Sequence, residues 1–102
     1  MYYALRCAEP FSTFRLPHPA TVTFKVNRAS MAFGDYEPDP HTIRISREAN
    51  ENLDAVFKTM AHEMVHLALE RKGAKDHSNH DAEFNALGAK VCDAWGWNFK
   101  EF

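Results

Sequence analysis

Cysteine and long apolar runs are both scarce in this sequence. Its 102 residues include only Cys7 and Cys92. Two cysteines so far apart cannot form the disulfide framework of a small secreted domain or a four-thiolate zinc ribbon, so we expect two reduced thiols. No stretch approaches the roughly 18 apolar residues of a membrane-spanning helix, and Arg6 lies where a signal peptide needs an apolar run. We therefore expect an intracellular, cytoplasmic protein that does not bind membranes.

An excess of either sign of charge is also lacking. Lys and Arg number 12, Asp and Glu number 14, and the formal net charge is −2. Such a balance creates no whole-molecule attraction for phosphates, so we expect weak or no direct nucleic-acid binding, arising only from small patches. The length and the hydrophobic fraction of 45% fit a single domain covering residues 1–102, which we expect to be a monomer.

The first half of the sequence reads as short strands separated by turns. Apolar and polar residues alternate over 21–26, a period of two that predicts a strand with one buried face. Further strands are predicted over 31–36 and 42–46. The segment 37–40 contains two prolines and is expected to interrupt the sheet. Residues 1–16 are ambiguous, because Pro10 limits any helix there to a short piece on either side.

The second half has the period of a helix. A long helix is predicted over roughly 51–72, with Asn50 or Asn52 as its cap and Gly73 after its end. A second helix is predicted to begin near residue 78 or 79. Each predicted helix has one apolar stripe. In the long helix the stripe comprises Leu53, Val56, Phe57, Met60, Met64 and Leu67, widened by Ala61 and Ala68. In the second helix it comprises Phe84, Leu87, Val91 and Trp95.

The long helix carries a pattern typical of metal-dependent hydrolysis. His62-Glu63-Met64-Val65-His66 matches HExxH. Imidazoles four residues apart on a helix lie on one side, about 5–6 Å apart at Cβ, so both can reach one zinc ion. Glu63 is displaced by ~100° around the helix and is placed to act as the general base on a metal-bound water.

Whether HExxH forms a zinc site here depends on a third ligand in addition to His62 and His66. His80 falls on the apolar face of the second helix near its start, where it is either a packed core histidine or a ligand that the fold brings to His62 and His66. Three histidines with one open position form a catalytic zinc shell, whereas a structural site has four protein ligands. Alternatives for the third position are His77, Asp81 and Glu83.

These residues resemble a known family. The run from His62 to Ala68, followed by a short charged loop and His80-Asp81-Ala82-Glu83-Phe84, is similar to the SprT-like zinc metallopeptidases. The similarity extends over roughly residues 14–97. It implies an α+β, zincin-like (minigluzincin-like) domain, with a small three-stranded, mostly antiparallel sheet packed on the HExxH helix and a C-terminal helix. It also implies that His62, His66 and His80 bind Zn²⁺ and that Glu63 is the catalytic base.

The resemblance implies peptide-bond hydrolysis of a protein or peptide, which in the Spartan branch is bound to DNA. We expect a compact form of the family, because many members carry a cysteine-rich zinc ribbon and these 102 residues contain only two cysteines. We expect the substrate to be held extended along a strand edge near residues 30–34. The alternatives are a zinc-dependent nucleic-acid hydrolase and a non-catalytic, zinc-stabilised, DNA-associated module. Peptide deformylase shares HExxH but takes a cysteine ligand from a Gly-Cys context that Cys7 lacks.

Other polar residues have simpler interpretations. Tyr36 is either a donor to the oxyanion of the reaction or half-buried packing at the end of a strand. The basic run of Arg71, Lys72, Lys75 and His77 is interpreted as a solvated helix end, with phosphate binding as the alternative. Met60 and Met64 are expected in the core, and His18 and His41, each beside a proline, in surface loops.

Overall fold

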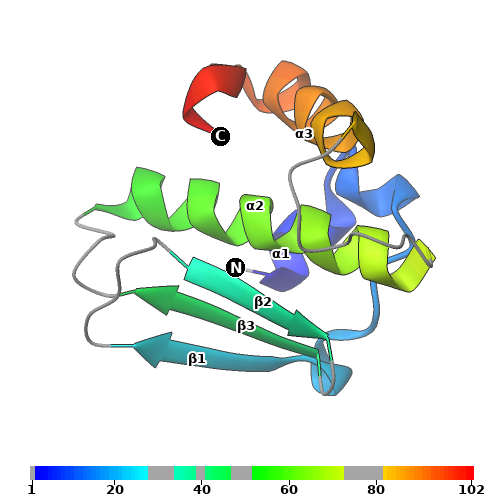
Figure 1. The fold of residues 1–102 in the computed structure, drawn as a ribbon, viewed down its shortest axis with the longest axis vertical. Helices are drawn as coiled ribbons and strands as arrows, with labels where there is room; N and C mark the ends of the chain where they lie inside the picture. Colours follow the sequence, from blue (N-terminus) through cyan, green and yellow to red (C-terminus); the bar gives the residue numbers. More distant parts are fainter. Residues whose placement is uncertain (1, 28–33, 39–40, 47–51, 73–81) are drawn as a thin grey trace.

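The computed structural model describes residues 2–27, 34–38, 41–46, 52–72 and 82–102. It is an α+β fold in which a three-stranded sheet lies on one side of a long helix and a second helix lies on the other (Figure 1). The elements are α1 Tyr2–Cys7, β1 Thr23–Asn27, β2 Gly34–Pro38, β3 His41–Ser46, α2 Leu53–Lys72 and α3 Ala82–Trp95, with short 3₁₀ helices at Phe11–Thr13, Pro19–Thr21 and Phe99–Glu101.

The sheet is mixed, with the order β1-β3-β2. β3 pairs in parallel with β1 and antiparallel with β2. The expectation of a mostly antiparallel sheet is therefore wrong for one of the two pairings. Alternation of apolar residues predicts which face of a strand is buried but carries no information about its neighbour. Here the last strand along the chain lies between the first two, and β2 becomes an edge strand.

Strand boundaries agree with the sequence within a few residues, with one exception. The predicted interruption at 37–40 is wrong for Glu37 and Pro38, which still belong to β2. Pro38 is paired with His41 at the end of the ladder. This position suits proline because an edge strand has one side on which the missing N–H is not needed. Half of the predicted strand 31–36, residues 31–33, lies outside the described residues.

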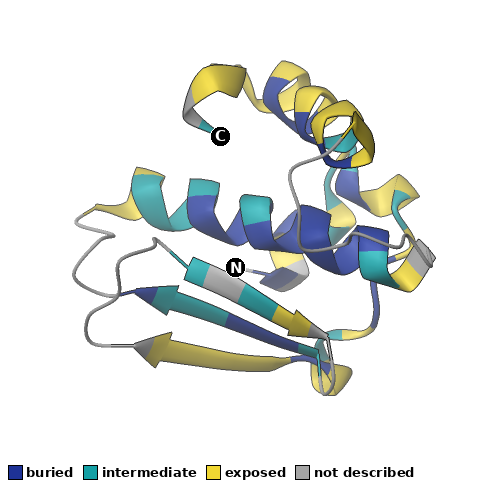
Figure 2. Ribbon diagram, in the orientation of Figure 1, coloured by how far each residue is buried: buried dark blue, intermediate teal, exposed yellow. Residues whose placement is uncertain are grey.

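α2 is buried almost all round in its middle (Figure 2). Every residue from Thr59 to Leu69 is buried except His62, which is half-buried. The sheet covers one side of the helix and α3 the other, so a single apolar stripe describes it poorly. Leu53, which was predicted on that stripe, is 66% exposed. The helix begins as expected with Asn52, whose side-chain oxygen accepts a hydrogen bond from the amide of Ala55 at 2.8 Å.

α3 packs on α2, and its Phe84, which contacts His62 and His66 of α2, is buried together with Gly88 and Val91. The helix is followed by Gly96, whose φ of +73° is the left-handed conformation that commonly ends helices. Trp95 was predicted on the buried stripe but is 38% exposed and stacks on Trp97. Residues 78 and 79, where this helix was predicted to begin, lie outside the described part.

The buried side chains form one apolar cluster, which includes Met60 and Met64 as expected. Both cysteines are free thiols, Cys7 exposed and Cys92 buried. Within the described ranges, no helix has the length and apolar character needed to cross a membrane.

Candidate metal centre

The two histidines of the HExxH pattern lie side by side on α2. Their ring centroids are 5.1 Å apart and the ring planes are inclined by 66°. His66 is 5% exposed, and His62 is half-buried. One turn of helix thus presents two imidazoles to the same small region, as the spacing of four residues predicts.

Aromatic rings from the C-terminal third of the chain cover these imidazoles. The Phe84 ring, from the first turn of α3, lies 4.9 Å from His62 and 4.6 Å from His66 between centroids. The Phe102 ring lies 5.2 Å from His62. Phe102 packs in turn over Gly88, where an added Cβ would lie only 3.1 Å from its ring. The absence of a side chain at position 88 therefore lets the tail approach α3 closely.

The tail also sets the protonation of one imidazole. Nδ1 of His62 lies 2.7 Å from the carbonyl oxygen of Phe102. A carbonyl oxygen can only accept a hydrogen bond, so Nδ1 carries the hydrogen and donates it. In the neutral ring the lone pair then belongs to Nε2. Metal-binding histidines commonly donate one ring nitrogen to a carbonyl oxygen and coordinate through the other. The two described imidazoles therefore fit two of the ligands of a zinc ion.

Glu63 is held inside the protein. Its side chain is 4% exposed, although it immediately follows the half-buried His62. Carboxylates are seldom buried, because removing a charge from water is costly, and functional sites are where such burial persists. The burial of Glu63 is thus compatible with the role that the motif predicts.

The predicted third ligand, His80, lies outside the described residues, as do His77 and Asp81. Glu83 is described and is exposed in the first turn of α3. No group of three His, Cys, Asp or Glu side chains suited to a metal ion occurs within the described ranges. In the sequence, however, His80 comes two residues before α3, the helix whose Phe84 contacts both imidazoles.

Tyr36 belongs to a polar cluster near the C-terminal end of α2, where Glu70 lies about one turn after His66. Its hydroxyl lies 2.7 Å from Nδ1 of His41 and 3.5 Å from Oε2 of Glu70. Burial, reinforced by the carboxylate of Glu70, raises the pKa of Tyr36 above its usual value. This half-buried position agrees with the packing interpretation of Tyr36. The expectation that His41 is in a surface loop is wrong, since it begins β3 and is half-buried.

The contact of Phe102 with His62 is the part of the site that sequence reasoning missed. Two aromatic residues near the end of the sequence, Phe99 and Phe102, are a weak signal for a tail that packs onto the domain, but nothing in their spacing points to a histidine 40 residues away.

His18 was interpreted correctly as a surface residue. Its exposed side chain accepts a hydrogen bond from the amide of Ala20.

Comparison with known sequences completes the description. A search among curated proteins returns no significant match. The sequence profile of the SprT-like family matches residues 6–100, a range that includes the whole sheet and both long helices. The profile covers nearly all of the sequence, and the chain therefore belongs to the SprT-like family.

Proposed function

We propose that this protein is a zinc-dependent metallopeptidase with a zincin-like active site. The observation that carries the proposal is the pair of adjacent imidazoles on α2 next to the buried Glu63, with Nδ1 of His62 donating to the backbone oxygen of Phe102 as metal-binding histidines commonly do. Membership of the SprT-like family supports the same activity.

His62, His66 and His80 would hold the zinc ion. When bound, zinc polarises the scissile carbonyl and makes water a better nucleophile near neutral pH. The protein supplies a helix that is packed on both sides, so that His62 and His66 keep their separation without the metal. The rings of Phe84 and Phe102 keep bulk water from the sides of the imidazoles that they cover.

Glu63 would accept a proton from the attacking water at its carboxylate and then deliver it to the departing amine. Both transfers require one carboxylate that stays in place between them. The burial of Glu63 in the packed middle of α2 supports this, because its side chain has little freedom to turn into solvent.

β2 would hold the substrate. It is the edge strand on the α2 side of the sheet (Figure 1). An extended peptide can add to such an edge through main-chain hydrogen bonds, a mode that fits a protein or peptide substrate. The expected edge at residues 30–34 is described only from Gly34 onwards.

A zinc-dependent nucleic-acid hydrolase and a purely zinc-stabilised module remain the alternative functions. A structural zinc site does not need a buried glutamate next to its first ligand. A nucleic-acid hydrolase must attract phosphates, whereas the net charge of this chain is −2. Both observations favour the peptidase.

The variant Glu63→Gln tests the proposal. Gln has the size of Glu but cannot accept the proton, so cleavage of a disordered protein should fall by about 10²-fold or more. Zinc content and thermal stability should stay close to those of the unsubstituted protein, which separates catalysis from folding. The exposed Glu9→Gln, far from α2 in the sequence, serves as the matched control and should cleave normally. Equal cleavage by the Glu63→Gln and unsubstituted proteins would end the peptidase hypothesis.

A further inference from the structure

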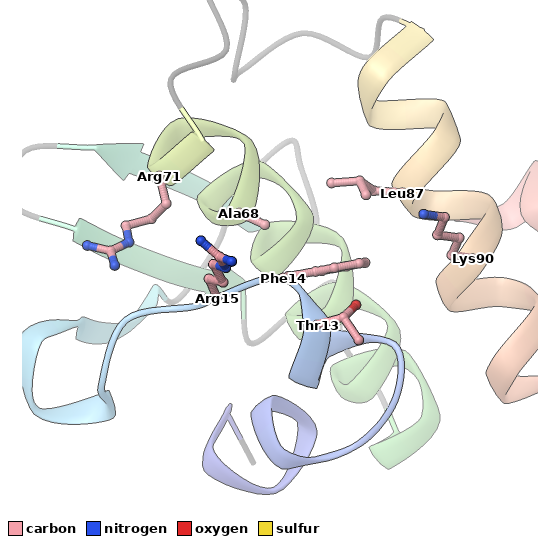
Figure 3. A pocket seen from close by; sticks show the side chains of 7 residues that line it. All are labelled: Thr13, Phe14, Arg15, Ala68, Arg71, Leu87 and Lys90. Carbon is pink, nitrogen blue, oxygen red and sulfur yellow. The ribbon is translucent and has the colours of Figure 1, made fainter.

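Three cationic residues from three separate segments line one pocket of about 640 Å³. Arg15 comes from the segment after the first 3₁₀ helix, Arg71 from the end of α2 and Lys90 from α3. In Figure 3, Arg15 lies between Arg71 and the ring of Phe14, the guanidinium group of Arg71 extends away from α3, and the amino end of Lys90 extends from α3 towards Leu87. The volume is in the range of sites for small organic molecules.

These cations lack carboxylate partners within the described ranges. Two other cations of the structure, Arg44 and Lys58, do have such partners, in Glu37 and Asp54. No ion pair joins a described acidic residue to any of the three cations lining the pocket. Like charges repel one another across a pocket, and an anion between them would replace repulsion by attraction. The concentration of positive charge is notable in a chain whose net charge is −2.

The backbone at Arg15 supports a binding role independently of charge. Its φ of +56° is in the left-handed region, which is costly for a residue with a side chain. It is the one residue other than glycine, among those described, with a positive φ. Residues held in such conformations cluster at sites that bind ligands, where the conformation directs a side chain. Here the side chain concerned is one of the three cations.

The rest of the lining is apolar. The ring of Phe14 lies between Arg15 and Lys90 in the view of Figure 3, and Leu87 lies beside Lys90. Thr13 adds no donor, because its hydroxyl donates to the carbonyl oxygen of Pro10 at 2.7 Å. The pocket thus combines cationic donors with an aromatic ring and an aliphatic side chain. Such a lining matches a ligand with one anionic end and one apolar part.

This pocket is distinct from the candidate metal centre. At 3.6 residues per turn, Ala68 and Arg71 lie about 120–180° around α2 from His62 and His66. Phe84 of α3 contacts the imidazoles, whereas Leu87 and Lys90 line the pocket. A ligand here would therefore hold the N-terminal segment, α2 and α3 together without occupying the proposed catalytic site.

We propose that this pocket binds the phosphoryl group of a small organic phosphate whose remaining part is aromatic or apolar. The guanidinium group of Arg15, which lies beside the ring of Phe14, is suited to paired hydrogen bonds with phosphoryl oxygens, and the charges of Arg71 and Lys90 on either side of it add longer-range attraction. Phe14 and Leu87 contact the apolar part.

Titration calorimetry with phenyl phosphate tests this directly. Inorganic phosphate lacks the apolar part and phenol lacks the charge, so both should bind at least about tenfold more weakly than phenyl phosphate. The protein is titrated with its metal bound, and loss of binding in the pocket variants below separates this pocket from phosphate bound at the metal centre, which makes the result independent of the proposed peptidase. Equal binding of inorganic and phenyl phosphate would overturn the part assigned to Phe14 and Leu87, and no binding of either would overturn the proposal.

Substitutions with Gln remove each charge while keeping a long polar side chain. Arg15→Gln, Arg71→Gln and Lys90→Gln should each weaken phenyl phosphate binding by about three- to tenfold. Lys25→Gln removes an exposed charge from β1, which does not line the pocket, and should leave binding unchanged. Thermal unfolding of each variant verifies that it is folded. Equal losses at Lys25 and at the three pocket residues would mean general charge attraction and would contradict a site.

A final titration separates a free phosphate from the phosphates of a nucleic-acid strand. Labelled single-stranded DNA should bind no more tightly than the non-specific range of about 10⁻⁴–10⁻⁶ M at physiological salt. Nanomolar DNA binding that is lost in the pocket variants would overturn the assignment to a small molecule.

Discussion

The carbonyl oxygen of Phe102 accepts a hydrogen bond of 2.7 Å from Nδ1 of His62, joining the end of the sequence to the middle of the HExxH helix. The same residue places its ring 5.2 Å from that imidazole. Orientation of a metal-binding histidine by a carbonyl is usual in zinc sites. In this fold the orienting group comes from the C-terminal tail, so the tail becomes part of the candidate metal centre.

Removal of residues 99–102 should weaken zinc binding. The deletion removes the acceptor for Nδ1 and uncovers the ring of His62, and loss of such an orienting group typically costs about 10- to 100-fold in metal affinity. Competition with a chromophoric chelator measures the effect. The variant Phe102→Ala keeps the carbonyl group and should lose much less affinity, while Lys100→Ala, at an exposed position, should lose none.

Those three variants separate two explanations. If Phe102→Ala weakens zinc binding as much as the deletion does, then the ring and not the carbonyl orients His62. If neither change affects zinc affinity, the tail has no role in the metal centre.

His80→Ala should lower zinc affinity severely and reduce thermal stability, because metal binding and folding are thermodynamically linked. Purified protein should contain close to one zinc ion per chain, as measured by elemental analysis. His77→Ala is the matched control and should retain its zinc. The reverse result would assign the third ligand to His77.

Stability should decrease at alkaline pH because of Tyr2. Burial raises the pKa of Tyr2 to about 12, although Arg6 and Arg71 oppose the shift. The unfolded chain therefore releases this proton first, near its ordinary pKa of about 10. The raised pKa of Tyr2 contributes to the free energy of unfolding fully below pH 10. This contribution, of the order of 2 kcal/mol, is lost as the pH rises towards 12.

Urea unfolding at a series of pH values from 8 to 12 measures this loss. Tyr2→Phe should make the decrease smaller, because it removes one of the two tyrosines whose pKa burial raises, and Tyr36 should account for a decrease that persists. It should also lower stability at neutral pH by about 1 kcal/mol, since the Tyr2 hydroxyl donates to the carbonyl of Pro17 at 2.7 Å. If the free energy of unfolding of Tyr2→Phe falls with alkaline pH as steeply as that of the unsubstituted protein, the decrease comes from a group other than Tyr2.

Gly34→Ala should destabilise the protein by about 1–3 kcal/mol, the usual range for overpacking. A Cβ at this position would lie 2.5 Å from the carbonyl oxygen of Arg44 and 2.8 Å from Cγ2 of Thr59. β2 would have to move away from both β3 and α2. Chemical denaturation measures the loss.

Gly96→Ala provides the contrast to Gly34→Ala. No atom lies within 4 Å of a Cβ at this position, so only the left-handed φ of +73° opposes the substitution. That cost is about 1–2 kcal/mol and does not involve the sheet. Cleavage of a protein substrate should therefore suffer in Gly34→Ala and be retained in Gly96→Ala.

The sequence predicts the local features of this fold well, because they depend on neighbouring residues. The long helix, expected over 51–72, extends from Leu53 to Lys72, and Asn52 caps it. The order of strands in the sheet depends on contacts between distant segments and was not predicted. For the same reason nothing local indicates that His41 bonds to Tyr36 or that Phe102 reaches His62.

The strand order also has a consequence for how the chain folds. β1 and β2 follow each other in the sequence but do not pair, because β3 lies between them. No early hairpin can form from the first two strands, and the sheet closes only when the third is inserted. The parallel pairing of β1 with β3 joins Thr23 to Thr42. Because these residues are far apart in the sequence, this pairing forms more slowly than contacts between neighbouring segments. During synthesis, β1 and β2 therefore leave the ribosome as unpaired strands and form their sheet only after β3 has followed them.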